Sequence, residues 1–118
     1  MGQIVQTVHL TELARNVGNY TGQTVRVCGG RWRGSMTRPD GTHRGWILSK
    51  VDPSGPRGPH VTSVYVACRT PRPRLVDGCL TGRIAREDGS QTPSETVTVS
   101  SHVTASREWW LHPQCGRS

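Results

Sequence analysis

The sequence predicts an all-β domain whose strands form a small, strongly curved barrel. Two segments, residues 24–31 and 78–85, share one pattern: apolar and polar residues alternate, a glycine interrupts the alternation, and an arginine follows. Alternation with a period of two is typical of a half-buried strand, and a glycine inside such a strand marks a bulge or bend. The 14 glycines and 8 prolines, with 32% hydrophobic residues, favour many turns over a helical bundle.

The chain length bounds the number of domains. At 118 residues, the chain can bury one modest core but not two. We therefore expect a single domain over residues 1–118, with the barrel at about 24–105 and a tail at 106–118 whose structure is not predicted. A short amphipathic helix is predicted at about 11–18, with Thr11 as its cap and Gly18 at its end. Its apolar residues follow helical spacing: Leu10, Leu13, Ala14 and Val17.

Five strands are expected in the barrel. They lie at about residues 24–33, 43–51, 60–69, 79–86 and 95–105. The third alternates most clearly, because Val64 and Val66 fall on one face and Tyr65 on the other. Residues 70–74 contain two prolines among basic residues, so this connection is predicted to be a stiff, extended loop.

The charge is unevenly distributed. Residues 26–86 carry twelve basic side chains against three acidic ones, a net charge of about +9, while the rest of the chain is slightly acidic. All the basic residues except Lys50 are arginine. Arginine binds phosphate with a planar fork and stacks on bases, which favours a polyanionic partner. A genome rich in G and C, which favours arginine codons, is the alternative explanation of the bias.

The four cysteines form no Cys-x-x-Cys pair. Cys28, Cys68 and Cys79 each fall in a predicted strand, where a free cysteine behaves as a small buried hydrophobe. We therefore expect free thiols and no zinc, since metal knuckles need closely spaced ligands. The sequence has no apolar run of membrane-spanning length and no signal-peptide pattern, so we expect an intracellular protein of the cytoplasm or nucleus without a membrane partner.

Several of these segments together resemble the OB-fold, a five-stranded Greek-key barrel that binds oligonucleotides. The resemblance depends on residues 25–30, 46–48, 75–78 and 80–84 and covers about residues 10–105. The short length and leading helix are most similar to small single-barrel subunits of single-stranded-DNA-binding assemblies, those of telomeres and primosomes among them. The proline-rich residues 70–74 depart from the family, which usually has a helix between the third and fourth strands.

The resemblance implies that a single strand binds across the second and third strands and the loops beside them. Aromatic side chains there would stack on bases, and arginines would neutralise phosphates. The expected nucleic-acid-binding residues are Arg31, Trp32, Arg33, Arg38, Arg44, Trp46, Tyr65, Arg69, Arg72, Arg74 and Arg83. Trp46 shares its strand face with Leu48, so core and exposed positions are both open for it, and the direction of Trp32 after two glycines cannot be predicted.

Two adjacent tryptophans, Trp109 and Trp110, lie in the tail. Successive side chains diverge on a strand or helix, so both do not easily enter one core. They are candidates for a partner interface, since aromatic residues often anchor such contacts. The alternative is that the tail folds back and covers one end of the barrel.

No catalytic motif is present in the sequence. The five histidines are scattered, the acidic residues form no pair, and Gly29-Gly30 lacks the lysine of a phosphate loop. We therefore expect that the protein is not an enzyme and has no cofactor. We expect it to bind single-stranded DNA, or RNA, within a DNA-maintenance or replication assembly. The alternative is a structural OB-fold subunit that contacts a protein partner or a second copy and has little affinity for nucleic acid.

Overall fold

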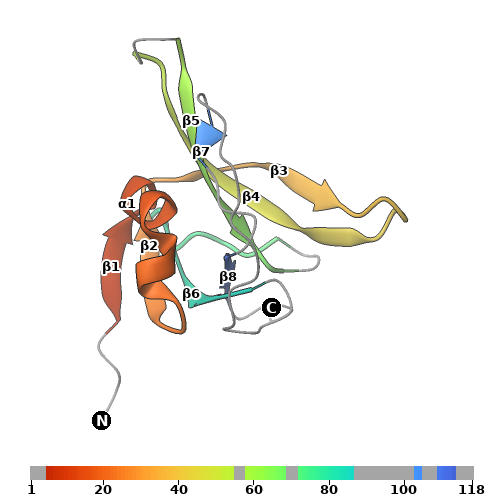
Figure 1. The fold of residues 1–118 in the computed structure, drawn as a ribbon, viewed down its shortest axis with the longest axis horizontal. Helices are drawn as coiled ribbons and strands as arrows, with labels where there is room; N and C mark the ends of the chain where they lie inside the picture. The colour runs from red at the N-terminus through yellow and green to blue at the C-terminus, as the bar shows by residue number, and fades with distance from the viewer. Residues whose placement is uncertain (1–4, 55–57, 69–71, 87–102, 105–108, 114–118) are drawn as a thin grey trace.

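The structure is a computed structural model that describes residues 5–54, 58–68, 72–86, 103–104 and 109–113 (Figure 1). It is mostly β, with little helix. The strands are β1 (Gln6–His9), β2 (Thr24–Cys28), β3 (Arg31–Thr37), β4 (His43–Asp52), β5 (His60–Val66), β6 (Cys79–Ala85), β7 (Val103–Thr104) and β8 (Trp110–His112). The helical elements are α1 (Leu10–Arg15) and the 3-10 helix η1 (Val17–Tyr20).

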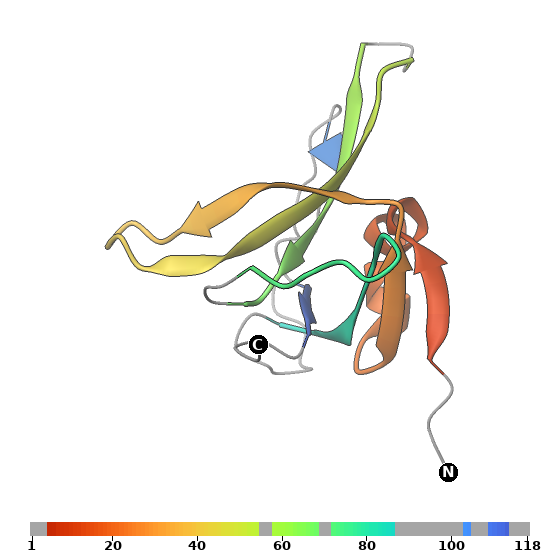
Figure 2. The ribbon, with the colours of Figure 1, turned by 180° about the vertical axis from the view of Figure 1, so that it is seen from behind.

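The described strands form one sheet in the order β1-β2-β6-β8-β5-β4-β3, and β7 pairs with β5. The sheet is not closed into a barrel by hydrogen bonds. Nevertheless β2, near one end of this order, and β3, at the other end, are separated in the chain only by Gly29 and Gly30. Figures 1 and 2 show β3 and β4 extending together as a long hairpin away from α1, β1 and β2.

The predicted glycine bend in the first strand is confirmed. Gly29 has a φ of +93°, which favours glycine, and a side chain at Gly30 would lie 2.5 Å from Leu10 Cδ1 and 2.8 Å from Leu48 Cγ. The second predicted break is wrong, because β6 runs without interruption through Gly82. Gly82 instead allows the backbone of His112 to approach within 2.8 Å of the position of a side chain.

The core lies between α1 and the inner face of the sheet. Residues that are almost completely buried come from several elements: Leu10, Leu13, Val25, Val27, Leu48, Val66, Ile84 and Leu111. The helix begins one residue earlier than predicted and ends at Arg15, and His9 rather than Thr11 caps it, since the Thr11 backbone N–H donates to His9 Nδ1 over 3.2 Å. The described residues of the connection from β5 to β6 contain no helix, as the prolines predicted.

The predicted strands at 43–51, 60–69 and 79–86 are confirmed within a few residues. Most of the predicted strand at 95–105 lies outside the described residues, which include only β7 from this segment. The sequence missed β8, which lies in the tail and pairs parallel with β5 and antiparallel with β6. The tail therefore contributes a strand to the middle of the sheet.

The two tail tryptophans are buried within this chain rather than presented to a partner. Trp109 is 8% exposed and belongs to the core cluster, while Trp110 is completely buried on the opposite face of β8. Adjacent side chains diverge as expected, but both directions are occupied by this protein's own residues. The partner-interface role is therefore corrected to its alternative, in which the tail folds back onto the sheet.

The expectation of free thiols is wrong. Cys28 and Cys79 form a disulfide between directly paired residues of β2 and β6, and Cys68 is also disulfide-bonded. The paired cysteines are 51 residues apart in the chain, so only the register of the two strands brings them together. Among the described residues, no helix is long and apolar enough to cross a membrane.

Candidate nucleic-acid interface

Two tryptophans and an arginine form a cluster beside the β3–β4 hairpin, which we call the aromatic cluster: Trp32, Trp46 and Arg72. The Arg72 guanidinium carbon lies 5.5 Å from the centre of the Trp32 ring and 5.9 Å from that of Trp46. These distances are within the range of cation–π attraction. One cation therefore contacts two indole rings that come from neighbouring strands.

The register of the hairpin positions both rings on the same face. Trp32 pairs with Leu48, and Ser35 pairs with Trp46, with a register shift at Arg33 between these pairs. Trp46 and Leu48 are two residues apart on β4, so their side chains leave the same side of the strand. Both tryptophans are half-buried and pack against the core. Trp46 is thus neither fully core nor fully exposed, and the Trp32 direction that the sequence left open is settled.

Arg72 reaches the rings from the connection between β5 and β6. We call residues 72–78 of this connection the connector, and they cross beside the β3–β4 hairpin (Figure 2). Arg72 is exposed, and its neighbour Pro73 is half-buried. The two prolines that ruled out a helix here also favour an extended backbone, which brings Arg72 alongside the hairpin.

His43 packs against Trp46 of this cluster. Its Nε2–H donates to the Cys68 carbonyl over 3.2 Å, because a carbonyl oxygen can only accept. The imidazole ring then lies 4.7 Å from the Trp46 ring, centre to centre, at 56°. Such a tilted arrangement is favourable for aromatic pairs. No sequence pattern indicates this role of His43, because it depends on the contact between β4 and the residues that follow β5.

Tyr65 is not part of the aromatic cluster. Trp46 pairs with Val66 and Ile47 pairs with Tyr65, so Tyr65 leaves the opposite face of the sheet. There its ring lies 5.2 Å from that of Trp110, and the Arg44 guanidinium lies 5.0 Å from the same Trp110 ring. The expected stacking surface of Trp32, Trp46 and Tyr65 is therefore divided between two faces.

The hairpin carries most of the other predicted arginines. Arg31 and Arg33 are exposed on β3, and Arg38 is exposed in the turn that follows it. The turn is held by Asp40, whose carboxylate accepts from the Thr42 hydroxyl at 2.7 Å and the Thr42 backbone N–H at 2.9 Å. The hydrogen bond from the Thr42 hydroxyl is the largest of the effects that lower the pKa of Asp40 below its ordinary value. This carboxylate therefore stays charged at neutral pH and places one negative charge near Arg38.

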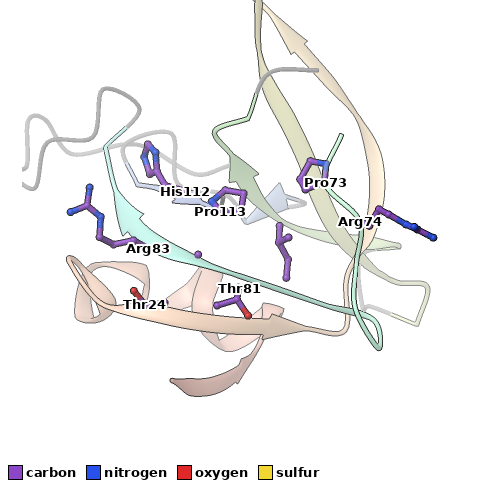
Figure 3. A pocket seen from close by; sticks show the side chains of 9 residues that line it. Thr24, Pro73, Arg74, Thr81, Arg83, His112 and Pro113 are labelled. Atoms are coloured by element: carbon purple, nitrogen blue, oxygen red, sulfur yellow. The ribbon is translucent and has the colours of Figure 1, made fainter. Parts of the chain in front are cut away.

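Arg74 and Arg83 do not reach the aromatic cluster but line a separate cavity of about 470 Å³, which we call the connector pocket. Its walls come from β2, β6, the connector and the end of β8 (Figure 3). His112 and the hydroxyl-bearing Thr24 and Thr81 line it as well. The sequence did not indicate these three residues, since only the packing of β8 beside β6 brings them together. Arg69 lies outside the described residues.

The arrangement provides flat aromatic surfaces beside positive charges. The half-buried indole rings can stack on bases, and the exposed arginines around them can neutralise phosphates. Within the described ranges, no group of three or more histidine, cysteine or acidic side chains could hold a metal ion. Comparison with protein-family models, with curated proteins and with solved structures finds no match for this chain.

Proposed function

We propose that the protein binds single-stranded nucleic acid without catalysis, with DNA as its main ligand, and that it works within a larger DNA-maintenance or replication assembly. The aromatic cluster is the observation that carries this proposal: two partly open indole rings meet an exposed arginine on a surface with a large excess of arginine. Proteins that bind single strands combine these two features, stacking platforms and a basic groove.

The order of the strands supports an OB-fold as the scaffold of this function. If β2 and β3 are counted as one strand bent at Gly29 and Gly30, that strand pairs with β6 on one side and β4 on the other. The strand β4 pairs with β5, and β8 bridges β5 and β6. Five strands joined in this way follow the order of an OB-fold barrel. The packing of α1 against the core would take the place of the helix that the described residues between β5 and β6 do not form.

The alternative function is a structural subunit that docks onto a protein, and the leading helix and the tail tryptophans would be the contacts of such a subunit. The apolar residues of α1 and both tail tryptophans are buried in the chain's own core and sheet. A protein partner would have to use other surfaces. If the purified protein has no affinity for single strands, that result favours this alternative over the proposed function.

The proposal includes a location in the cytoplasm or nucleus, because cellular nucleic acid is found there. The disulfides set a condition on it, because thiols are kept reduced in these compartments and disulfides persist in oxidising ones. In the reducing cytosol, Cys28 and Cys79 would be adjacent thiols on β2 and β6. The strand-binding surface does not include this pair.

Replacing Trp32 by leucine should weaken the binding of single-stranded DNA. Leucine keeps an apolar contact with the core but removes the stacking platform, which is worth roughly 1–3 kcal/mol per base, or about a 5- to 150-fold higher Kd. The affinity of a labelled oligonucleotide is measured by fluorescence anisotropy, and the fold of each variant is checked by its thermal unfolding.

Tyr65→Leu is the matched control, because it removes an aromatic ring from the other face of the sheet. We expect Tyr65→Leu to bind with an affinity close to that of the wild type. If folded Trp32→Leu protein binds normally while Tyr65→Leu binds weakly, the stacking surface lies on the face of Tyr65 and Trp110 instead.

A further inference from the structure

The connector pocket has the composition expected of a site for a phosphate-bearing ligand. Arg74, Arg83 and His112 line it, and the described part of its lining includes no acidic side chain. A volume of about 470 Å³ lies within the range of small-ligand sites. The His112 ring is fixed because its Nε2–H donates to the Arg86 carbonyl over 2.6 Å. Arg74 and Arg83 are exposed at the edges of the pocket, and the His112 ring is held in place beside Arg83.

The two arginines lie at opposite ends of the pocket. Figure 3 shows Arg83 and His112 at one end and Pro73 and Arg74 at the other, with Thr81 between them. Along β6 the lining runs from Leu80 to Arg83, a distance of about 10 Å for three residues of a strand. A single compact anion could contact one end only. An elongated ligand that carries phosphate at its ends fits better.

The rest of the lining is apolar or hydroxyl-bearing. Pro73, Pro113 and Leu80 provide apolar surface, and Thr81 provides a hydroxyl. A nucleotide within a strand has this same distribution, because a base and sugar lie between two phosphates. The rigid proline rings can contact a base or sugar, while the arginines at the ends contact the phosphates on either side.

We propose that the connector pocket is a second nucleotide subsite, which takes a nucleotide of the strand whose other bases stack at the aromatic cluster. The proposal rests on the proposed function. Its geometric basis is the connector itself: Arg72 contacts the rings of the aromatic cluster, and the next two residues, Pro73 and Arg74, line the pocket. The two subsites are thus on either side of one extended segment, and a strand that crosses the connector reaches both.

The length of the bound strand separates the two subsites in an experiment. Arg83→Gln is compared with Arg15→Gln, a control on the exposed surface of α1 that lies outside both subsites. For a strand of about thirty nucleotides, we expect Arg83→Gln to reduce the slope of log Kd against log salt by about 0.7, the value for one phosphate contact on a single strand, while Arg15→Gln leaves it unchanged. For a strand of about three nucleotides, too short to occupy both subsites at once, we expect a smaller difference between the two variants.

A direct probe uses thymidine 5′-monophosphate and the amide spectrum of the protein. We expect the nucleotide to shift the backbone signals of Thr81, Gly82 and Arg83 in the wild type and in Arg15→Gln, and to lose this effect in Arg83→Gln. Shifts confined to residues of the aromatic cluster would contradict the second subsite.

The two proposals can fail separately. If the wild type binds no single strand at all, the proposed function is wrong, and the strand path with it. If the wild type binds long strands but Arg83→Gln has the same affinity and salt slope as Arg15→Gln, the proposed function stands and the second subsite is wrong.

Discussion

Replacing Trp110 by alanine should lower the free energy of unfolding by about 3–5 kcal/mol, the range for removing a large aromatic side chain from a packed interior. Trp110 is completely buried and lies on β8, the strand that joins β5 to β6. Its ring contacts Tyr65 and approaches within 2.8 Å of the position that a side chain at Gly45 would occupy. The lost ring leaves a cavity that these neighbours cannot fill without moving the sheet.

Urea unfolding of the variant, followed by circular dichroism, measures this loss. Val76→Ala is the control, because Val76 is 67% exposed and its replacement should change the stability by less than about 0.5 kcal/mol. If Trp110→Ala unfolds at the same urea concentration as the wild type, the tail does not belong to the sheet, and the tryptophans return as candidates for a partner interface.

The double variant Cys28→Ser/Cys79→Ser should be less stable than the oxidised wild type by about 4 kcal/mol. A disulfide stabilises a protein mainly by restricting the unfolded chain, and for a loop of this length the loss of entropy on cross-linking corresponds to about that value. The loop is long, since the bond joins residues 51 positions apart. Replacing both cysteines leaves no unpaired thiol at this site that could form a wrong bond.

Chemical unfolding of the double variant and of the wild type gives the difference in stability. The thiols of the wild type are counted after denaturation without a reductant, and we expect Cys28, Cys68 and Cys79 not to react. Reactive thiols at Cys28 and Cys79, with equal stability of the two proteins, would contradict the disulfide and restore the sequence-based prediction of free thiols.

Local patterns were sufficient to predict much of the fold. The alternation in residues 60–66 gave a strand, the glycines after β2 gave a bend, and the prolines between β5 and β6 excluded a helix there. These features depend on a few neighbouring residues, so they can be read from the chain. The strand β8 is only three residues long, and its place depends on two partners distant in sequence, which no local pattern shows.

The sequence predicted several residues of the candidate site but not how these residues are arranged. The sequence named Trp32, Trp46 and Arg72, which the structure brings together. It also placed Tyr65 on the same surface, which the register of β4 and β5 excludes, because Trp46 lies opposite Val66. A shift of one residue between strands moves a side chain to the other face, and register is set by long-range pairing. The Cys28–Cys79 disulfide was missed for the same reason, because the register of β2 and β6 cannot be predicted from the sequence.

The most direct test of the account is a titration of the intact protein with a single-stranded DNA of about thirty nucleotides at two salt concentrations, followed by tryptophan fluorescence. Stacking of bases on Trp32 and Trp46 should quench the signal. Since binding releases counterions from the phosphates, we expect the affinity to fall about 20- to 50-fold between roughly 50 and 200 mM salt if three or four arginines contact phosphates. No detectable binding at the lower salt concentration would contradict the central claim that this surface binds single strands.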